Sequence, residues 1–147
     1  MLKLNGADFT VGRSRFVDNL FEGGEQTAKI YVKIMPEALG VPILAQLDTG
    51  AAWSIFEPEI AAAMGILDAK GVSVKLSTRH GEIPGHLVDS VSVAILADEG
   101  EGLNVSATVF VSREWPKGNF IGYSGFLERI RIGLDPRDNS FHFGPIP

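Results

Sequence analysis

The residue best placed for chemistry is Asp48, which lies where an apolar run meets a glycine turn. Residues 42–47 are mainly apolar, Asp48-Thr49-Gly50 follows, and apolar residues resume at Ala51. A carboxylate at such a place is costly to bury unless its charge is shared, paired or hydrogen-bonded. It could act as a general acid or base, or it could simply cap a turn through its side chain. The triplet alone favours the turn.

The longer pattern around Asp48 resembles the active-site loop of retropepsin-like aspartic peptidases. In that family, Asp-Thr-Gly-Ala is followed three residues later by Ser or Thr within apolar strands, and Ser54 fills this position. A second family signature, two apolar residues and a glycine before a short helix, is matched by Phe120-Ile121-Gly122 with Phe126-Leu127 behind it. Both motifs occur in the family's order, over about residues 28–143. The resemblance implies that Asp48 is catalytic and that its loop comprises Thr49, Gly50, Ala51 and Ser54.

The reaction that this resemblance implies needs two carboxylates sharing one proton, because like charges about 3 Å apart cannot both ionise. The ionised carboxylate activates a water, and the protonated one hydrogen-bonds the peptide carbonyl. The chain has one Asp-Thr-Gly and no Asp-Ser-Gly, and its 147 residues are too few for two lobes of ordinary domain size. The second carboxylate is therefore expected from another copy, which makes the working unit a homodimer.

The resemblance also implies roles for the residues after Asp48. The Thr49 hydroxyl would bond across the two-fold axis to the loop of the other copy. Gly50 would let the backbone approach substrate closely, and Ala51 would keep the floor beneath the carboxylates small. Thr49 could equally be a β-branched residue that suits a strand end. Viral members commonly carry an acidic residue where this chain has Ala52, and often Arg where it has Tyr123. An intersubunit ion pair of the viral kind is therefore not expected.

A Gly-tipped hairpin is predicted from residues 72–78 and 82–89, which flank a turn. The resemblance places the substrate-covering flap here, with Arg79, His80 and Gly81 at its tip facing substrate. The alternative is an ordinary surface hairpin with solvated charges, and both interpretations fit the sequence.

A second loop, Trp115-Pro116-Lys117-Gly118, precedes the strand that ends at Gly122. Related enzymes place a specificity loop beside the cleft at this point, so Pro116, Lys117 and Gly122 are candidate substrate contacts. For Trp115, packing into the core is an equally good interpretation. Trp53 could likewise form the floor of a substrate subsite or pack inside the barrel.

The elements expected around these residues are mostly strands. Apolar and polar residues alternate in five segments, the period of half-buried strands: 29–34, 72–77, 90–95, 104–111 and 130–134. Short helices are predicted over 57–65, which has Pro and Glu in its first turn and Gly at its end, and over about 125–129. The predicted fold class is all-β with one or two short helices, and the resemblance implies a mainly antiparallel closed barrel of the retropepsin-like type.

Composition limits the alternatives. With 45% hydrophobic and 21% charged residues, residues 1–147 are expected to form a single domain whose first 25 residues make an arm without a readable pattern. A net charge of -5 argues against nucleic acid as a partner. The three histidines lack metal-ligand spacing, so no metal and no cofactor are expected. No signal peptide or membrane-spanning segment is visible, which predicts a cytoplasmic protein.

Two functions compete. The first is an endopeptidase that binds extended peptides by strand addition, with apolar side chains flanking the cut. The second is a non-catalytic module of the same fold for dimerisation or peptide binding. Only the first should lose turnover on Asp48→Asn and bind a transition-state mimic. A small-molecule-binding barrel has little support, since it would need neither motif.

Overall fold

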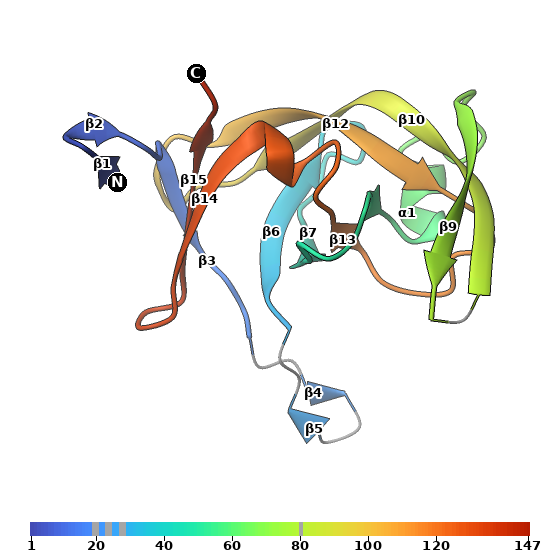
Figure 1. The fold of residues 1–147 in the computed structure, drawn as a ribbon, viewed down its shortest axis with the longest axis horizontal. Helices are drawn as coiled ribbons and strands as arrows, with labels where there is room; N and C mark the ends of the chain where they lie inside the picture. Colours follow the sequence, from blue (N-terminus) through green and yellow to red (C-terminus); the bar gives the residue numbers. More distant parts are fainter. Residues whose placement is uncertain (19–20, 23–24, 27–28, 80) are drawn as a thin grey trace.

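The computed structural model describes residues 1–18, 21–22, 25–26, 29–79 and 81–147. These residues form mainly short strands, together with a six-residue helix and a 3-10 turn (Figure 1). The all-β prediction is therefore confirmed.

A closed barrel is the larger part of the described chain. Its members are β6 (Tyr31–Pro36), β7 (Ile43–Leu47), β8 (Ser54–Ile55), β10 (Gly81–Ile95), β12 (Leu103–Val111) and β13 (Phe120–Ile121). They neighbour one another in the order β12, β8, β13, β7, β6 and β10, and pairing of β12 with β10 closes the ring. Most of these pairs are antiparallel, but β13 runs parallel to β7 and β8 runs parallel to β12. The predicted closed barrel is confirmed.

The barrel forms because alternate residues of its strands are apolar. Val32 and Ile34 on β6, and Val93 and Ile95 on β10, are at most 1% exposed. Ile34 lies directly opposite Ile95 across the two strands. Burying these β-branched side chains face to face supplies the hydrophobic stabilisation that sets the strand register.

A second sheet packs beside the barrel and joins one strand from near the N-terminus to the last two strands of the chain. It consists of β11 (Glu99–Gly100), β3 (Gly12–Arg15), β15 (Ser140–Pro145) and β14 (Ile130–Asp135), in that order. The sequence did not predict β3, because Gly-Arg-Ser-Arg offers no apolar alternation. Its place is set by partners instead: Arg13 donates 2.8 Å hydrogen bonds to Ser140 Oγ and to Glu99 Oε1. Two small hairpins, β1 (Lys3–Leu4) with β2 (Ala7–Asp8) and β4 (Phe21–Glu22) with β5 (Glu25–Gln26), complete the strands.

The predicted hairpin is present, but its second strand is longer than expected. β9 (Val72–Thr78) pairs with the first half of β10, and β10 continues without ending through residues 90–95. The sequence suggested two strands because the alternation changes phase near Asp89. The structure accommodates this shift with an irregularity between Val88 and Val91, where Ser90 takes a φ of 58°.

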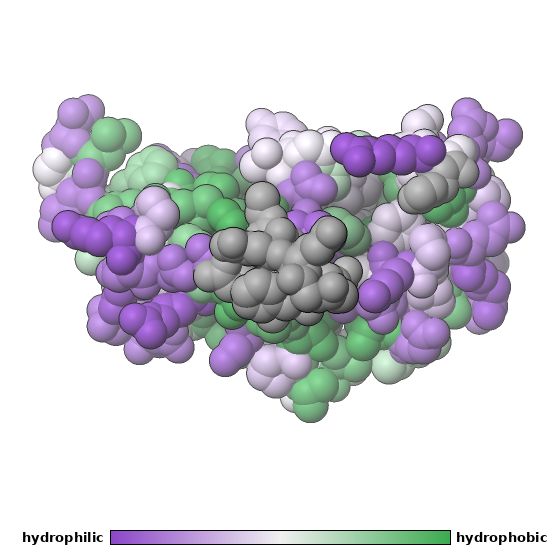
Figure 2. All heavy atoms as spheres, turned by 90° about the horizontal axis from the view of Figure 1, so that it is seen from below, coloured by the Kyte–Doolittle hydropathy of each residue, from purple (hydrophilic) through white to green (hydrophobic). Residues whose placement is uncertain are grey.

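The helical segments are shorter than predicted. α1 spans Pro58–Ala63 with Pro58 in its first turn, and η1 (Leu127–Arg129) is a 3-10 turn. In the described part of the chain, no helix has the length and apolar character needed to cross a bilayer. On the face shown in Figure 2, hydrophobic and hydrophilic residues are interspersed around the grey atoms.

Candidate active site

Asp48 directly follows the end of β7 and continues its hydrogen bonding. The N–H of Gln46 donates to the carbonyl of Asn119 at 2.8 Å, and the N–H of Asp48 donates to the carbonyl of Ile121 at 3.0 Å. Both acceptors belong to the segment that runs parallel to β7. The strand geometry therefore extends through Asp48, whose backbone position is fixed.

The Asp48 carboxylate is partly exposed and held by its own loop. The N–H of Gly50 donates to Oδ1 at 2.9 Å, and the N–H of Ala51 donates to the backbone carbonyl of Asp48 at 3.2 Å. This is the turn that the simplest interpretation of the triplet predicts. Within the described residues, Oδ2 has no hydrogen bond. One oxygen thus orients the carboxylate, while the other is left for water, substrate or a second carboxylate.

The two sequence motifs meet at Ser54 and Gly122. The N–H of Gly122 donates to Ser54 Oγ at 3.0 Å, and both residues are buried. A Cβ atom at position 122 would lie 2.3 Å from the carbonyl carbon of Trp53 and 2.4 Å from its oxygen. Only glycine fits this approach without moving the backbone. The structure therefore brings together residues that are 68 positions apart in the chain.

Residues 51–53 run alongside residues 123–124 at this junction. The N–H groups of Tyr123 and Ser124 donate to the carbonyls of Ala51 and Ala52, each at 2.9 Å, and Trp53 bridges Ser124 in parallel. Tyr123 and Thr49 point into solvent: Tyr123 is 53% exposed, and the Thr49 hydroxyl has no hydrogen bond in the described part of the chain. The loop thus presents polar groups outward while its backbone is locked.

The loop that carries Pro116 and Lys117 is held from inside. The Trp115 indole N–H donates to the carbonyl of Gly118 at 2.8 Å, and its ring meets Phe120 edge-on with centroids 5.7 Å apart. Pro116 and Lys117 are exposed at the outside of this turn. Trp115 therefore packs within its own loop, half-buried.

A second pair of bonds ties this loop to the start of α1. The Glu57 carboxylate accepts the N–H of Gly118 at 3.0 Å, and the Asn119 side-chain oxygen accepts the N–H of Glu57 at 2.9 Å. No local pattern in the sequence indicates these contacts, because the partners lie about sixty positions apart.

A hollow opens between this loop and the start of the barrel, with a volume of about 270 Å³. It is lined by Lys29, Tyr31, Leu44, Gln46, Glu57, Lys117, Gly118, Asn119 and Phe120. Lys117 is thus brought beside Gln46, which is two residues before Asp48, whereas Pro116 is not among the lining residues. Gln46 was missed by the sequence analysis, although its two-residue spacing from Asp48 already placed both side chains on one strand face.

The tip of the β9–β10 hairpin carries the other predicted substrate contacts. Arg79 is exposed, and Gly81 adopts a φ of 105° while its carbonyl accepts a 2.8 Å hydrogen bond from the Thr78 hydroxyl. His80 lies outside the described residues. Within those residues, no hydrogen bond or ion pair links Arg79 or Gly81 to the Asp48 loop. Their contact with substrate stays a prediction.

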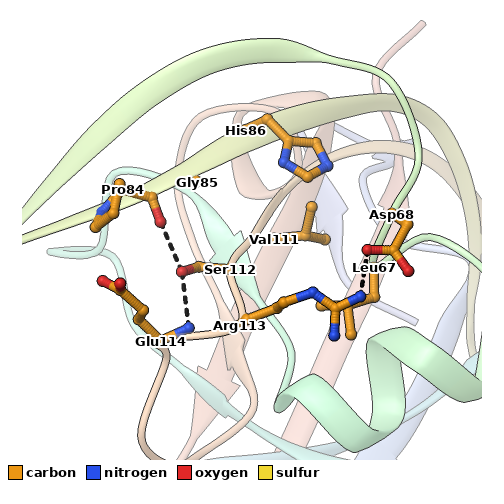
Figure 3. Close-up of a pocket in the computed structure, with 9 residues that line it drawn as sticks. All are labelled: Leu67, Asp68, Pro84, Gly85, His86, Val111, Ser112, Arg113 and Glu114. Carbon is orange, nitrogen blue, oxygen red and sulfur yellow. Dashed lines mark hydrogen bonds and ion pairs between the residues drawn. The ribbon is translucent and has the colours of Figure 1, made fainter.

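Another hollow lies at the base of this hairpin and is lined by residues 67–68, 84–86 and 111–114 (Figure 3). Its polar groups bond one another: Arg113 pairs with Asp68, Ser112 Oγ donates to the carbonyl of Pro84 at 2.6 Å, and the N–H of Glu114 donates to Ser112 Oγ at 3.1 Å. The Ser112 bond ties the loop after β12 to β10, the Arg113 pair ties it to Asp68 in the segment after α1, and none of these contacts involves the Asp48 loop. Across the described chain, no cluster of His, Asp and Glu is arranged to hold a metal ion.

Comparison with known proteins addresses the fold. No family model and no curated protein matches the sequence. Among solved structures, a retropepsin-like aspartic protease from Rickettsia conorii superposes with a TM-score of 0.61, covering 90% of this chain and 98% of the other at 20% identity. The chain has a retropepsin-like fold. At this identity the likeness concerns architecture.

Proposed function

We propose that the chain is an aspartic endopeptidase that works as a homodimer, with Asp48 of each copy supplying one carboxylate. The observation that carries the proposal is that Asp48 Oδ2 has no hydrogen bond to any described residue, on a loop whose backbone is hydrogen-bonded to residues 121, 123 and 124. A carboxylate that only capped a turn would not need the second motif to be packed against its loop.

The chemistry requires a second carboxylate, because one group cannot be both the base and the acid of the same step. The ionised Asp48 takes a proton from a water, which attacks the peptide carbonyl. The protonated Asp48 of the other copy hydrogen-bonds the carbonyl oxygen and then helps to protonate the leaving nitrogen. The bond from the Gly50 N–H to Oδ1 orients each carboxylate beforehand, so less reorganisation is needed.

The outer face of the loop supports a second copy as the partner. Thr49 is exposed and its hydroxyl has no bond within the described chain, and Tyr123 is also exposed. A two-fold axis beside this loop would give each copy the same surface to contact, as an isologous interface requires. Thr49 would then bond the partner loop and hold the carboxylates coplanar.

The test compares peptide cleavage by wild type and Asp48→Asn from acid to neutral pH. We expect the variant to lose activity by about a thousandfold or more, because the pair can no longer share a proton. Asp98→Asn is the matched control, since Asp98 is exposed and lies outside the loop. Cleavage should also fall more steeply than protein concentration on dilution, in step with dissociation measured by sizing.

A folded dimer that cleaves no peptide of a diverse library and binds no transition-state mimic would contradict the proposal. That result would favour the dimerisation or peptide-binding module. Cleavage retained in Asp48→Asn would instead contradict the assignment of the catalytic residue.

A further inference from the structure

We infer that the hollow lined by Gln46 and Lys29 is a substrate subsite that selects an acidic side chain, glutamate above all, next to the cut bond. This inference rests on the proposed peptidase function and adds a substrate preference to it. It also differs from the apolar preference that the sequence alone suggested.

The hollow lies close to Asp48, on the same face of β7. Residues 44, 46 and 48 alternate with Ile43, Ala45 and Leu47, and Ala45 is fully buried in the barrel core. Because pairing to the neighbouring segment continues through Asp48, the side chains of Gln46 and Asp48 lie on the same, open face. Two strand residues span about 7 Å. A peptide carbonyl held over Asp48 therefore places the adjacent side chain at the mouth of the hollow.

The lining of the hollow offers hydrogen-bond donors and one apolar wall. Lys29 is exposed and makes no ion pair with any described residue, and the side-chain amide of Gln46 has no hydrogen bond among them. Both groups can donate hydrogen bonds to an incoming carboxylate. Phe120, directly opposite Gln46 on the parallel neighbour, offers an apolar surface to the aliphatic part of a long side chain.

The charged residues that line the hollow are mostly positive. Its charged lining residues are Lys29, Lys117 and Glu57, so their summed charge is positive in a chain whose net charge is -5. Glu57 is turned toward the wall, where its carboxylate accepts the N–H of Gly118. Two of the three charged lining residues are positive, so a carboxylate in the hollow can make charge-assisted hydrogen bonds, which are stronger than neutral ones.

The walls of the hollow are held in place, and a subsite selects among side chains only if its walls keep their shape. The Trp115, Glu57 and Asn119 bonds hold the loop on one side, and β7 forms the other side. The walls of the hollow are thus fixed before a carboxylate enters, and the side-chain entropy lost on binding is mainly that of Lys29 and Gln46.

The experiment uses peptides in which the residue before or after the cut is Glu, Gln or Leu, with kcat/KM measured near pH 6. We expect wild type to prefer Glu over Leu by about tenfold, which corresponds to about one charge-assisted hydrogen bond. Lys29→Gln should reduce this ratio about fivefold, and Gln46→Leu should shift it toward Leu. Lys70→Gln removes an exposed charge outside the hollow and should leave the ratio as it is. The preference should fade below about pH 4, where the peptide glutamate becomes protonated.

Binding of the same peptides to the Asp48→Asn protein separates the two proposals. Cleavage without a Glu preference, or a preference that survives Lys29→Gln, overturns the subsite while the peptidase stands. Absence of any cleavage overturns the peptidase, and the subsite then stands only if Glu peptides bind more tightly than Leu peptides in a Lys29-dependent way. If binding shows no such difference, the subsite is overturned as well.

Discussion

Replacing Ser54 by alanine tests whether the two motifs really depend on each other. Ser54 is completely buried, and its hydroxyl accepts the N–H of Gly122 at 3.0 Å. Alanine has nearly the same shape, so the substitution mainly leaves that N–H without a partner. An unsatisfied buried donor costs about 1–3 kcal/mol. For a chain of 147 residues, a loss of about 2 kcal/mol corresponds to a fall in Tm of roughly 4–8 °C.

The assay is thermal and urea unfolding of wild type and Ser54→Ala at one fixed protein concentration, because association would add to apparent stability. Ser106→Ala is the matched control: Ser106 is exposed on β12, and its loss should change the free energy of unfolding by no more than about 0.5 kcal/mol. If Ser54→Ala were as stable as Ser106→Ala, the hydroxyl would not be satisfying the Gly122 N–H. The second motif would then not hold the Asp48 loop through this bond.

Two further substitutions probe the same packing and the second sheet. Gly122→Ala should destabilise the protein by about 1–3 kcal/mol or more in urea unfolding, because its Cβ would overlap the Trp53 backbone. Gly102→Ala is the control, since a Cβ at position 102 would have no atom closer than 3.1 Å. Equal stability of the two variants would refute the clash. Burial, followed by the charge of Arg13, lowers the pKa of His142. The unfolded chain therefore binds a proton near pH 6.5 that the folded chain does not, so stability should fall as pH drops below about 6.5. His142→Gln should flatten this part of the pH dependence of unfolding, and an unchanged slope would show that another group is responsible.

Local patterns predicted those parts of the fold that alternation determines. The barrel strands around Val32, Ile34 and Val93 were visible because each buries every second side chain. β3 was not, since its residues are glycine and polar, and they are placed by partners near the other end of the chain. The continuity of β10 was also missed, because an irregularity at Ser90 changes the phase of the pattern without ending the strand.

The candidate site shows the same division. Asp48 and Gly122 were found because each belongs to a contiguous motif. The bonds that join Glu57 to Gly118 and Asn119 connect segments about sixty residues apart, and no periodicity encodes such a contact. Gln46 could be predicted in part. The alternation of side chains along β7 already placed it on the same face as Asp48, but only the structure of the adjacent loop shows that it borders a hollow.

The unusual length of β10 means that one strand belongs to two units of different stability. Its second half, from Val91 to Ile95, lies between β12 and β6, with Val93 and Ile95 fully enclosed. Near its start, Gly81–Leu87 pairs with β9, a strand whose residues are exposed or half-buried and which lies at the sheet edge. Local opening near the tip breaks few apolar contacts, whereas opening beyond His86 would break the pairing of β10 with β12 that closes the barrel. The start of that pairing at His86, four residues before the irregularity at Ser90, therefore marks the boundary between local opening of the hairpin and global unfolding.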